Sequence, residues 1–197
     1  MSSQNSRIDL KFYSVTARRW KDFELLFGQN GACGGCWCMH WRLRQSEYDK
    51  QKGSGNRRAM KKLIESGKPP GIIGYINKEP VAWCCVGPRK DFSKLERSRT
   101  LKPIDDKPVW SILCLFVAKS FRKAGLSSQV VEAAADYAFS KGAVIGEGYP
   151  YETGKKKWAD PFVFTGLASS FKKAGFKVVA RPSKSRRIVR LFRAAVI

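Results

Sequence analysis

A short basic segment between an apolar run and a helical pattern could bind the phosphates of a nucleotide-type ligand. Residues 116–127 read Phe-Val-Ala-Lys-Ser-Phe-Arg-Lys-Ala-Gly-Leu-Ser. The first amides of a helix have no acceptor within the helix, and the helix dipole favours an anion there. Gly125 would let the backbone approach a diphosphate, Ser127 would add a hydroxyl, and Arg122 and Lys123 would add charge. An ordinary strand–loop–helix with a solvated basic loop is the alternative interpretation.

A second segment carries candidate zinc ligands at Cys33, Cys36, Cys38 and His40. Thiolates and imidazole are the ligands that zinc prefers. Structural zinc sites usually draw ligand pairs from separated segments, whereas this run is tight, and large apolar side chains alternate with its last two candidates. We therefore predict a packed cluster of thiols and aromatic rings without a bound metal. His40, the only histidine, could also contact a substrate, and it is a weaker candidate base than Glu147.

The elements that would position these residues alternate between strand and helix patterns. Apolar runs and period-two alternation predict strands at 8–15, 71–76, 80–86, 110–117, 143–149, 176–181 and 187–193. Helical spacing predicts helices at 16–27, 56–66, 125–141 and 165–174. Residues 45–55 suggest a surface loop or part of a helix, and residues 88–107 a polar connection. This order favours an α/β fold with one mixed sheet and helices on both faces.

Length and composition fit one domain with a packed core. The chain has 197 residues, of which 43% are hydrophobic. No apolar run approaches bilayer length, and residues 1–9 are polar without a signal-peptide core, so we expect a cytoplasmic protein with no membrane partner. In a reducing cytosol the six cysteines are expected to be thiols or metal ligands rather than disulfides. The net charge of +22, from 38 Lys and Arg against 16 Asp and Glu, favours anionic partners.

The basic segment and its context resemble the GCN5-related N-acetyltransferases (GNAT). Arg122-x-x-Gly125-x-Ser127 is similar to the Gln/Arg-x-x-Gly-x-Gly/Ala signature of that family, with Ser127 in place of the last small residue. It follows a strand and opens a helix, as in the family, and Gly175-Phe176 resembles the end of the family's fourth helix. The Cys/Trp-rich segment looks like that of an uncharacterised bacterial-type subgroup. The resemblance implies a single GNAT-like acyl-CoA N-acyltransferase domain over 1–197, with an acceptor-side elaboration at 1–68 and an acetyl-CoA-binding core at 71–197.

What the resemblance implies for the cosubstrate is specific. Acetyl-CoA would lie between two splayed strands, and its pantetheine arm would pair with the backbone of Leu115, Phe116 and Val117. Its diphosphate would lie on the amides that open the following helix. These belong to Arg122, Lys123, Ala124, Gly125, Leu126 and Ser127.

The usual acid and base of the family are missing. The positions that match the tyrosine acid, a frequent asparagine and the glutamate base hold Phe171, Phe164 and Ser111. The remaining candidates lie at or beyond the end of the strand at 143–149. They are Glu147 as general base and Tyr149 or Tyr151 as general acid. The alternatives are an ion-pair role for Glu147 and a packed aromatic role for Tyr149.

A cysteine nucleophile is a further possibility at Cys114. This residue alternates with Trp110, Ile112 and Phe116 on a predicted strand, so we favour an inert buried thiol. Cys84 and Cys85 have the same interpretation.

Three functions fit the sequence. The first is transfer of an acetyl group from acetyl-CoA to a primary amine. The second is a catalytically silent acyl-CoA-binding protein, because the usual acid and base are absent. The third is a nucleic-acid-binding module, because residues 172–193 are rich in Lys and Arg and have no acidic residue, although no nucleic-acid-binding motif accompanies them. The charge favours an acceptor that carries negative charge, and the acceptor's identity and the oligomeric state stay open.

Overall fold

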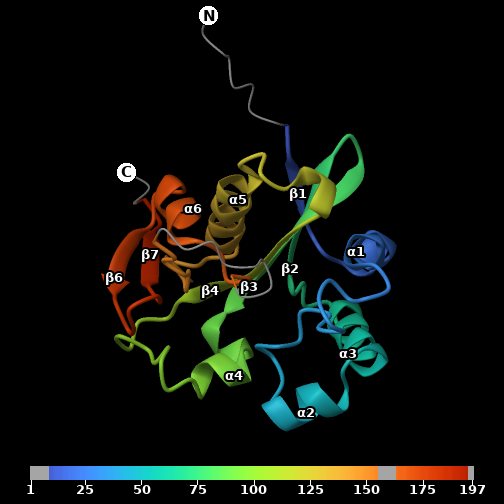
Figure 1. The fold of residues 1–197 in the computed structure, drawn as a ribbon, viewed down its shortest axis with the longest axis horizontal. Helices are drawn as coiled ribbons and strands as arrows, with labels where there is room; N and C mark the ends of the chain where they lie inside the picture. The colour runs from blue at the N-terminus through green and yellow to red at the C-terminus, as the bar shows by residue number, and fades with distance from the viewer. Residues whose placement is uncertain (1–8, 155–162, 195–197) are drawn as a thin grey trace, which may run out of the picture.

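The computed structural model describes residues 9–154 and 163–194, which form one seven-stranded sheet with the order β1-β2-β3-β4-β5-β7-β6. Figure 1 shows the sheet between two layers of helices. The strands are β1 (Lys11–Ser14), β2 (Gly71–Ile76), β3 (Glu79–Pro88), β4 (Trp110–Val117), β5 (Ile145–Gly148), β6 (Lys177–Ala180) and β7 (Ile188–Phe192). Among the described strands, β4 and β5 pair in parallel and the other neighbours pair antiparallel. The predicted mixed α/β sheet is confirmed.

Helices cover both faces of the sheet (Figure 1). The helices are α1 (Trp20–Phe27), α2 (Gln45–Lys50), α3 (Ser54–Glu65), α4 (Ser93–Glu96), α5 (Leu126–Ser140) and α6 (Ala168–Lys173), with 3-10 turns η1 (Ala17–Arg19), η2 (Arg89–Asp91) and η3 (Lys119–Phe121). One core cluster packs α5 and α6 against the sheet, and the other packs α1, α3 and α4 against the opposite face. Within the described ranges, no helix is both long and apolar enough to cross a bilayer.

Local patterns predicted most elements well. The strand at 110–117 has the bounds of β4, and the predicted hairpin turn between β2 and β3 has positive φ angles at Asn77 and Lys78, as a tight hairpin requires. Ile8, the first residue of the predicted strand at 8–15, lies outside the described residues. The interpretation of 88–107 as a polar connection is wrong, because it contains η2 and α4 and buries the side chains of Arg89, Phe92, Leu95 and Leu101.

A bulge divides β4 into two halves. The register with β3 shifts between Cys84 and Val86, so Leu113 and Cys114 together oppose Cys85, and both belong to the core on the α1 side. The simple alternation predicted for Cys114 is therefore broken. Trp110–Ile112, which pair with Gly146–Gly148 of β5, form the paired half of β4. Cys114–Val117 form the open half, in which the side chains change from buried to half-buried at Leu115.

Candidate functional site

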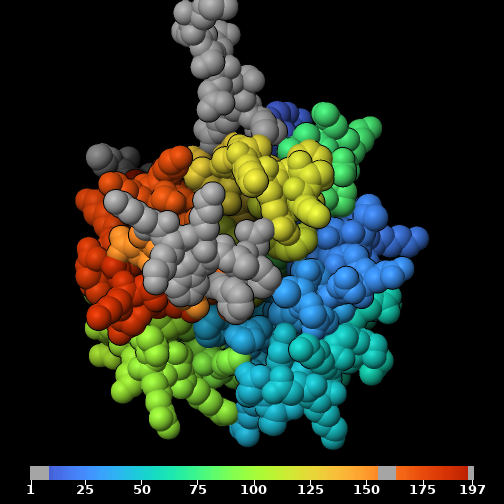
Figure 2. Space-filling view, in the orientation of Figure 1, coloured from blue at the N-terminus to red at the C-terminus, as the bar shows by residue number. Residues whose placement is uncertain are grey.

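The basic segment forms an exposed loop between β4 and α5, as Figure 2 shows in yellow. η3 turns the chain after β4, and Lys123 and Gly125 then take left-handed backbone conformations with φ of 66° and 74°. No side chain caps the N-terminus of α5, and its first turn contains no acidic residue. The positive end of the helix dipole is thus left for an external anion.

Gly125 suits the N-cap of α5 because of its backbone conformation. Its left-handed backbone is strained for residues with a side chain, and a Cβ built on it meets no protein atom within 4 Å. A side chain there would project into the space that a bound diphosphate would use. The neighbouring Arg122 lies across the end of β4, where its Nε donates to the carbonyl oxygen of Val117 at 2.9 Å and its guanidinium lies 5.8 Å from the Phe116 ring centroid.

The open half of β4 faces the segment that precedes α6. The amide of Leu115 donates to the carbonyl oxygen of Phe164 at 2.8 Å. The Phe164 ring in turn packs on the N-terminal segment, with its centroid 5.4 Å from His40 and 6.1 Å from Trp41. Two of the three backbone positions expected to pair with pantetheine therefore already have one group occupied within the chain, the amide of Leu115 and the carbonyl of Val117. Phe116 and Val117 are half-buried at the same edge.

Glu147 and Tyr149, the candidate base and acid, lie side by side inside the protein. Glu147 is 1% exposed and Tyr149 is 0% exposed. The Tyr149 hydroxyl lies 2.7 Å from Glu147 Oε1 and 2.8 Å from Ser111 Oγ. Burial first, and then the Glu147 charge, raise the pKa of Tyr149 well above its usual range. Their catalytic roles stay predictions.

Two buried arginines complete this cluster. Arg190 Nε donates to Glu147 Oε2 at 2.6 Å, and Arg89 Nη1 donates to Glu147 Oε1 at 3.3 Å and to the Tyr149 hydroxyl at 3.0 Å. Arg190 also binds Asp105 with both terminal nitrogens, at 2.6 and 3.0 Å. This geometry supports the ion-pair alternative for Glu147. Sequence reasoning missed Arg89, Arg190 and Asp105, and the only available signal was the apolar spacing of Phe92 and Leu95 near Arg89.

Tyr151, the other candidate acid, lies three residues after the end of β5 and contacts a different arginine. Its hydroxyl accepts from Arg186 Nη2 at 2.6 Å, and the Arg186 guanidinium lies 3.6 Å from its ring centroid. Arg186 also donates to the Tyr149 carbonyl and to Thr165. With Arg190 buried as well, several cations of the basic run at 172–193 hold the fold together instead of facing solvent.

Phe171 stands at the position that the sequence resemblance matched to the tyrosine acid of the family. It is fully buried, and a Cβ on Gly148 would lie 2.1 Å from its ring. Gly148 is the last β5 residue paired with β4. The close approach of backbone and ring therefore closes the α6 side of the sheet where the two strands part.

The Cys/Trp-rich segment packs as an irregular cap over β3 and β4. Cys38 is buried and accepts a hydrogen bond from Trp83 Nε1 at 3.2 Å, and burial first, then contact with Cys114, raise its pKa. The contact with Cys38 lowers the pKa of Cys114, burial raises it, and the resulting value is about 11. Neither thiol is therefore a ready nucleophile at neutral pH.

The four candidate zinc ligands do not share one environment. Cys33 is exposed, Cys36 and His40 are half-buried, and Cys38 is buried. Over residues 9–154 and 163–194, no group of three or more His, Cys, Asp or Glu side chains is arranged to hold a metal ion.

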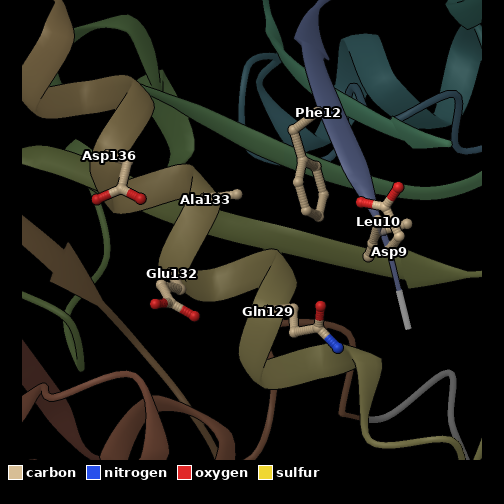
Figure 3. A pocket seen from close by; sticks show the side chains of 7 residues that line it. All are labelled: Asp9, Leu10, Phe12, Gln129, Glu132, Ala133 and Asp136. Carbon is tan, nitrogen blue, oxygen red and sulfur yellow. The ribbon is translucent and has the colours of Figure 1, made fainter. Parts of the chain in front are cut away.

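A separate hollow of about 400 Å³ lies between α5 and the start of β1. Figure 3 shows Glu132 and Asp136 on α5 and Asp9 near β1 around it. Burial first, and then the Glu132 charge, raise the pKa of Asp136. Its lining is acidic and would repel the phosphates of CoA, unlike the basic loop at the start of α5.

The comparisons agree with this arrangement. The model of the acetyltransferase (GNAT) family matches residues 37–146, more than half of the chain. No curated protein matches the sequence. Solved structures with a similar fold include a GNAT acetyltransferase from Streptococcus agalactiae, with a TM-score of 0.55, 11% identity and coverage of 94% of this chain and 96% of that one.

Two further structures resemble the chain over nearly their full lengths. The PaiA N-acetyltransferase of Thermoplasma acidophilum, solved with coenzyme A, has a TM-score of 0.51 at 10% identity and covers 94% of this chain and 99% of that one. The Drosophila melanogaster polyamine N-acetyltransferase has a TM-score of 0.53 at 12% identity and covers 93% and 100%. With the family match, the bulged and divided β4 and the uncapped basic start of α5, the chain belongs to the acetyltransferase (GNAT) family.

Proposed function

We propose that the protein transfers the acetyl group of acetyl-CoA to a primary amine by direct attack of the amine on the thioester. The observation that carries the proposal is the open half of β4 followed directly by the basic start of α5. The open half of β4 offers backbone groups beside the point where β4 and β5 separate. The start of α5 offers the positive end of the helix dipole to a diphosphate. Family membership supports the same cosubstrate.

The chain's contribution to the reaction would be binding, orientation and polarisation. The amides of residues 122–127 would hold the diphosphate, and the backbone of Phe116 and Val117 would orient the pantetheine arm. A backbone amide at the β4 bulge would polarise the thioester carbonyl. As the amine nitrogen bonds to the carbonyl carbon, the carbon–sulfur bond breaks, CoA leaves as a thiolate and the amine loses a proton. Glu147 is the proposed base, and its two arginine partners make the ion-pair role the alternative to be tested.

Calorimetry with CoA tests the cosubstrate, with Gly125→Val as the critical variant. Its β-branched side chain would occupy the diphosphate position, so we expect binding to fall at least a hundredfold while the fold is kept. Gly142→Val is the matched control, because Gly142 follows α5 with a φ of 88° and a Cβ there also meets no atom within 4 Å. It carries the same backbone strain at the far end of the same helix.

The outcomes separate the three functions. Equal CoA affinity in the two glycine variants, or no binding by the unaltered protein at millimolar CoA, would rule out the proposed site. CoA binding without release of CoA from acetyl-CoA in the presence of a mixture of primary amines would support a silent acyl-CoA-binding protein. Nucleic-acid binding without CoA binding would support the basic module.

A further inference from the structure

A second pocket lies on the face of the sheet that α1, α3 and α4 cover, where α2 meets α4. It encloses about 390 Å³. Figure 1 shows the two helices next to each other, and in Figure 2 their cyan and green atoms meet along the same face. The lining residues are Trp41, Arg44, Gln45, Ser93, Lys94, Arg97 and Ser98. This lining includes three cations and no carboxylate, in contrast to the acidic hollow beside α5.

The pocket has a buried donor without an acceptor. Trp41 is 6% exposed, and its indole Nε1 is among the few buried side-chain nitrogens and oxygens that have no hydrogen-bond partner in the described structure. Leaving such a donor unpaired costs about 1–3 kcal/mol. The nitrogen itself is closed to solvent, so an acceptor atom of a ligand in the pocket would reach it only after a small shift of the indole ring.

Lys94 is held in the wall of the pocket by Gln45 and His40. Its Nζ donates to Gln45 Oε1 at 2.5 Å and lies 3.1 Å from His40 Nε2. The other end of the Gln45 amide donates to Asp49, which fixes the orientation of the amide. Lys94 Nζ also lies 3.3 Å from His40 Nδ1, so its hydrogens already have neighbours, and Lys94 would attract an anion mainly through its charge. Burial lowers the pKa of Lys94, and an anion beside it would oppose that effect.

Ser98 and two arginines complete the polar part of the lining. The Ser98 hydroxyl accepts from the Leu101 amide at 3.0 Å, so its hydrogen is available to another acceptor. Arg44 and Arg97 add two exposed guanidinium groups at the rim. A set of donors and cations of this kind fits an oxyanion, whose oxygens accept hydrogen bonds and carry negative charge.

A single residue, Phe164, connects the pocket to the open half of β4. Trp41 packs on Phe164, with ring centroids 6.1 Å apart, and the Phe164 carbonyl accepts from the Leu115 amide at 2.8 Å. We infer that this pocket binds a carboxylate or phosphate group of the acetyl acceptor, so that the acceptor is a small acidic amine. The assignment to an acceptor rests on the proposed acetyl transfer, whereas the binding of an oxyanion does not.

Nuclear magnetic resonance of the full chain labelled with nitrogen-15 tests the inference at Trp41 itself. The indole N–H signal of Trp41 is identified by its loss in Trp41→Phe. Inorganic phosphate and acetate are titrated separately at constant ionic strength. We expect this signal to move saturably with at least one of the two anions, because a bound anion changes the electric field at an indole ring that lines the pocket, and the tighter anion identifies the acidic group.

Two charge variants supply the specificity control. Lys94→Met should lower the affinity for the anion at least tenfold. Lys102→Met removes an equal charge from an exposed site outside the pocket and should leave the affinity within twofold of the original. A Trp41 signal that does not move, or equal weakening in the two variants, would overturn the inference.

The CoA experiment distinguishes the two proposals. A Trp41 response in a protein that does not bind CoA would remove the acetyl-transfer proposal and leave an anion site without an acceptor role. CoA binding without a Trp41 response would remove the anion site alone.

Discussion

The two halves of β4 are held in opposite ways. The paired half is locked to β5 by backbone pairing and by a buried cluster in which Glu147 and Tyr149 meet two arginines. In the open half, the Leu115 amide donates to the Phe164 carbonyl instead of pairing with β5. The side chains from Leu115 to Val117 are half-buried. The buried carboxylate and its two arginines are thus on the locked side, whereas the backbone groups proposed to bind the thioester are on the open side. Whether Glu147 supports the fold or takes part in the chemistry is the question that this comparison poses.

The largest effect that could break this comparison is expected from Glu147→Gln. Removing the carboxylate leaves two buried guanidinium groups without their shared partner, so the free energy of unfolding should fall by about 3–5 kcal/mol. Urea unfolding measures the loss. Glu96→Gln is the control, because it removes a carboxylate from Arg89 that is 42% exposed, and its cost should be near 1 kcal/mol or less.

The same variant tests Glu147 as a base. Turnover near that of the original protein, with a lower stability, would assign the ion-pair role. A roughly 10²–10⁴-fold fall in kcat with unchanged CoA affinity would assign general-base catalysis and place chemistry in the locked half after all.

A smaller loss is expected from Gly148→Ala. The new methyl group would overlap the buried Phe171 ring, which has no open space to move into, and such overpacking costs about 1–3 kcal/mol. Gly146→Ala lies two residues earlier on the same strand, where a Cβ would make ordinary contact at 3.6 Å with Phe176. Thermal unfolding of the pair should show a clear difference, and equal midpoints would mean that Phe171 does not fix this strand junction.

Hydrogen exchange with and without CoA would sharpen the comparison along one strand. Saturating CoA should slow the exchange of peptides covering 115–117 and 122–127 about tenfold or more, because these backbone groups gain partners or lose solvent. Peptides covering 110–112 should change little, since β5 already protects them. Equal protection of the two halves would contradict the division at the bulge.

The smallest effect concerns a proton on the open side. Burial first, and then Lys94, lower the pKa of His40 to about 4. The unfolded chain therefore takes up this proton near pH 6.5, before the folded protein does, and acidification from about pH 6.5 to pH 4 favours unfolding. Thermal midpoints of the original protein should fall more steeply over this interval than those of His40→Gln. Parallel falls would show that His40 does not contribute.

Sequence patterns predicted the strands, the long helix and the basic loop because each is encoded by neighbouring residues. The apolar run at 110–117 and the Arg122-x-x-Gly125 motif need no distant partner to be recognised. The connection at 88–107 was misread because burial of Arg89 depends on Glu147 and Tyr149, which are far away in the chain. The bulge at Leu113 and Cys114 was missed for a related reason, since a register shift is a property of two strands and leaves little trace in one.

The locked cluster also has a consequence for the order of folding. Its contacts join residues 58, 43 and 85 positions apart, in the pairs Arg89–Glu147, Glu147–Arg190 and Asp105–Arg190. Contacts of such long range require large loops to close first, so the cluster should assemble after the rate-limiting barrier. Changes within it would then leave the refolding rate nearly constant and appear almost entirely as faster unfolding. The arginine–carboxylate cluster would thus set the unfolding rate and determine how long the native state persists.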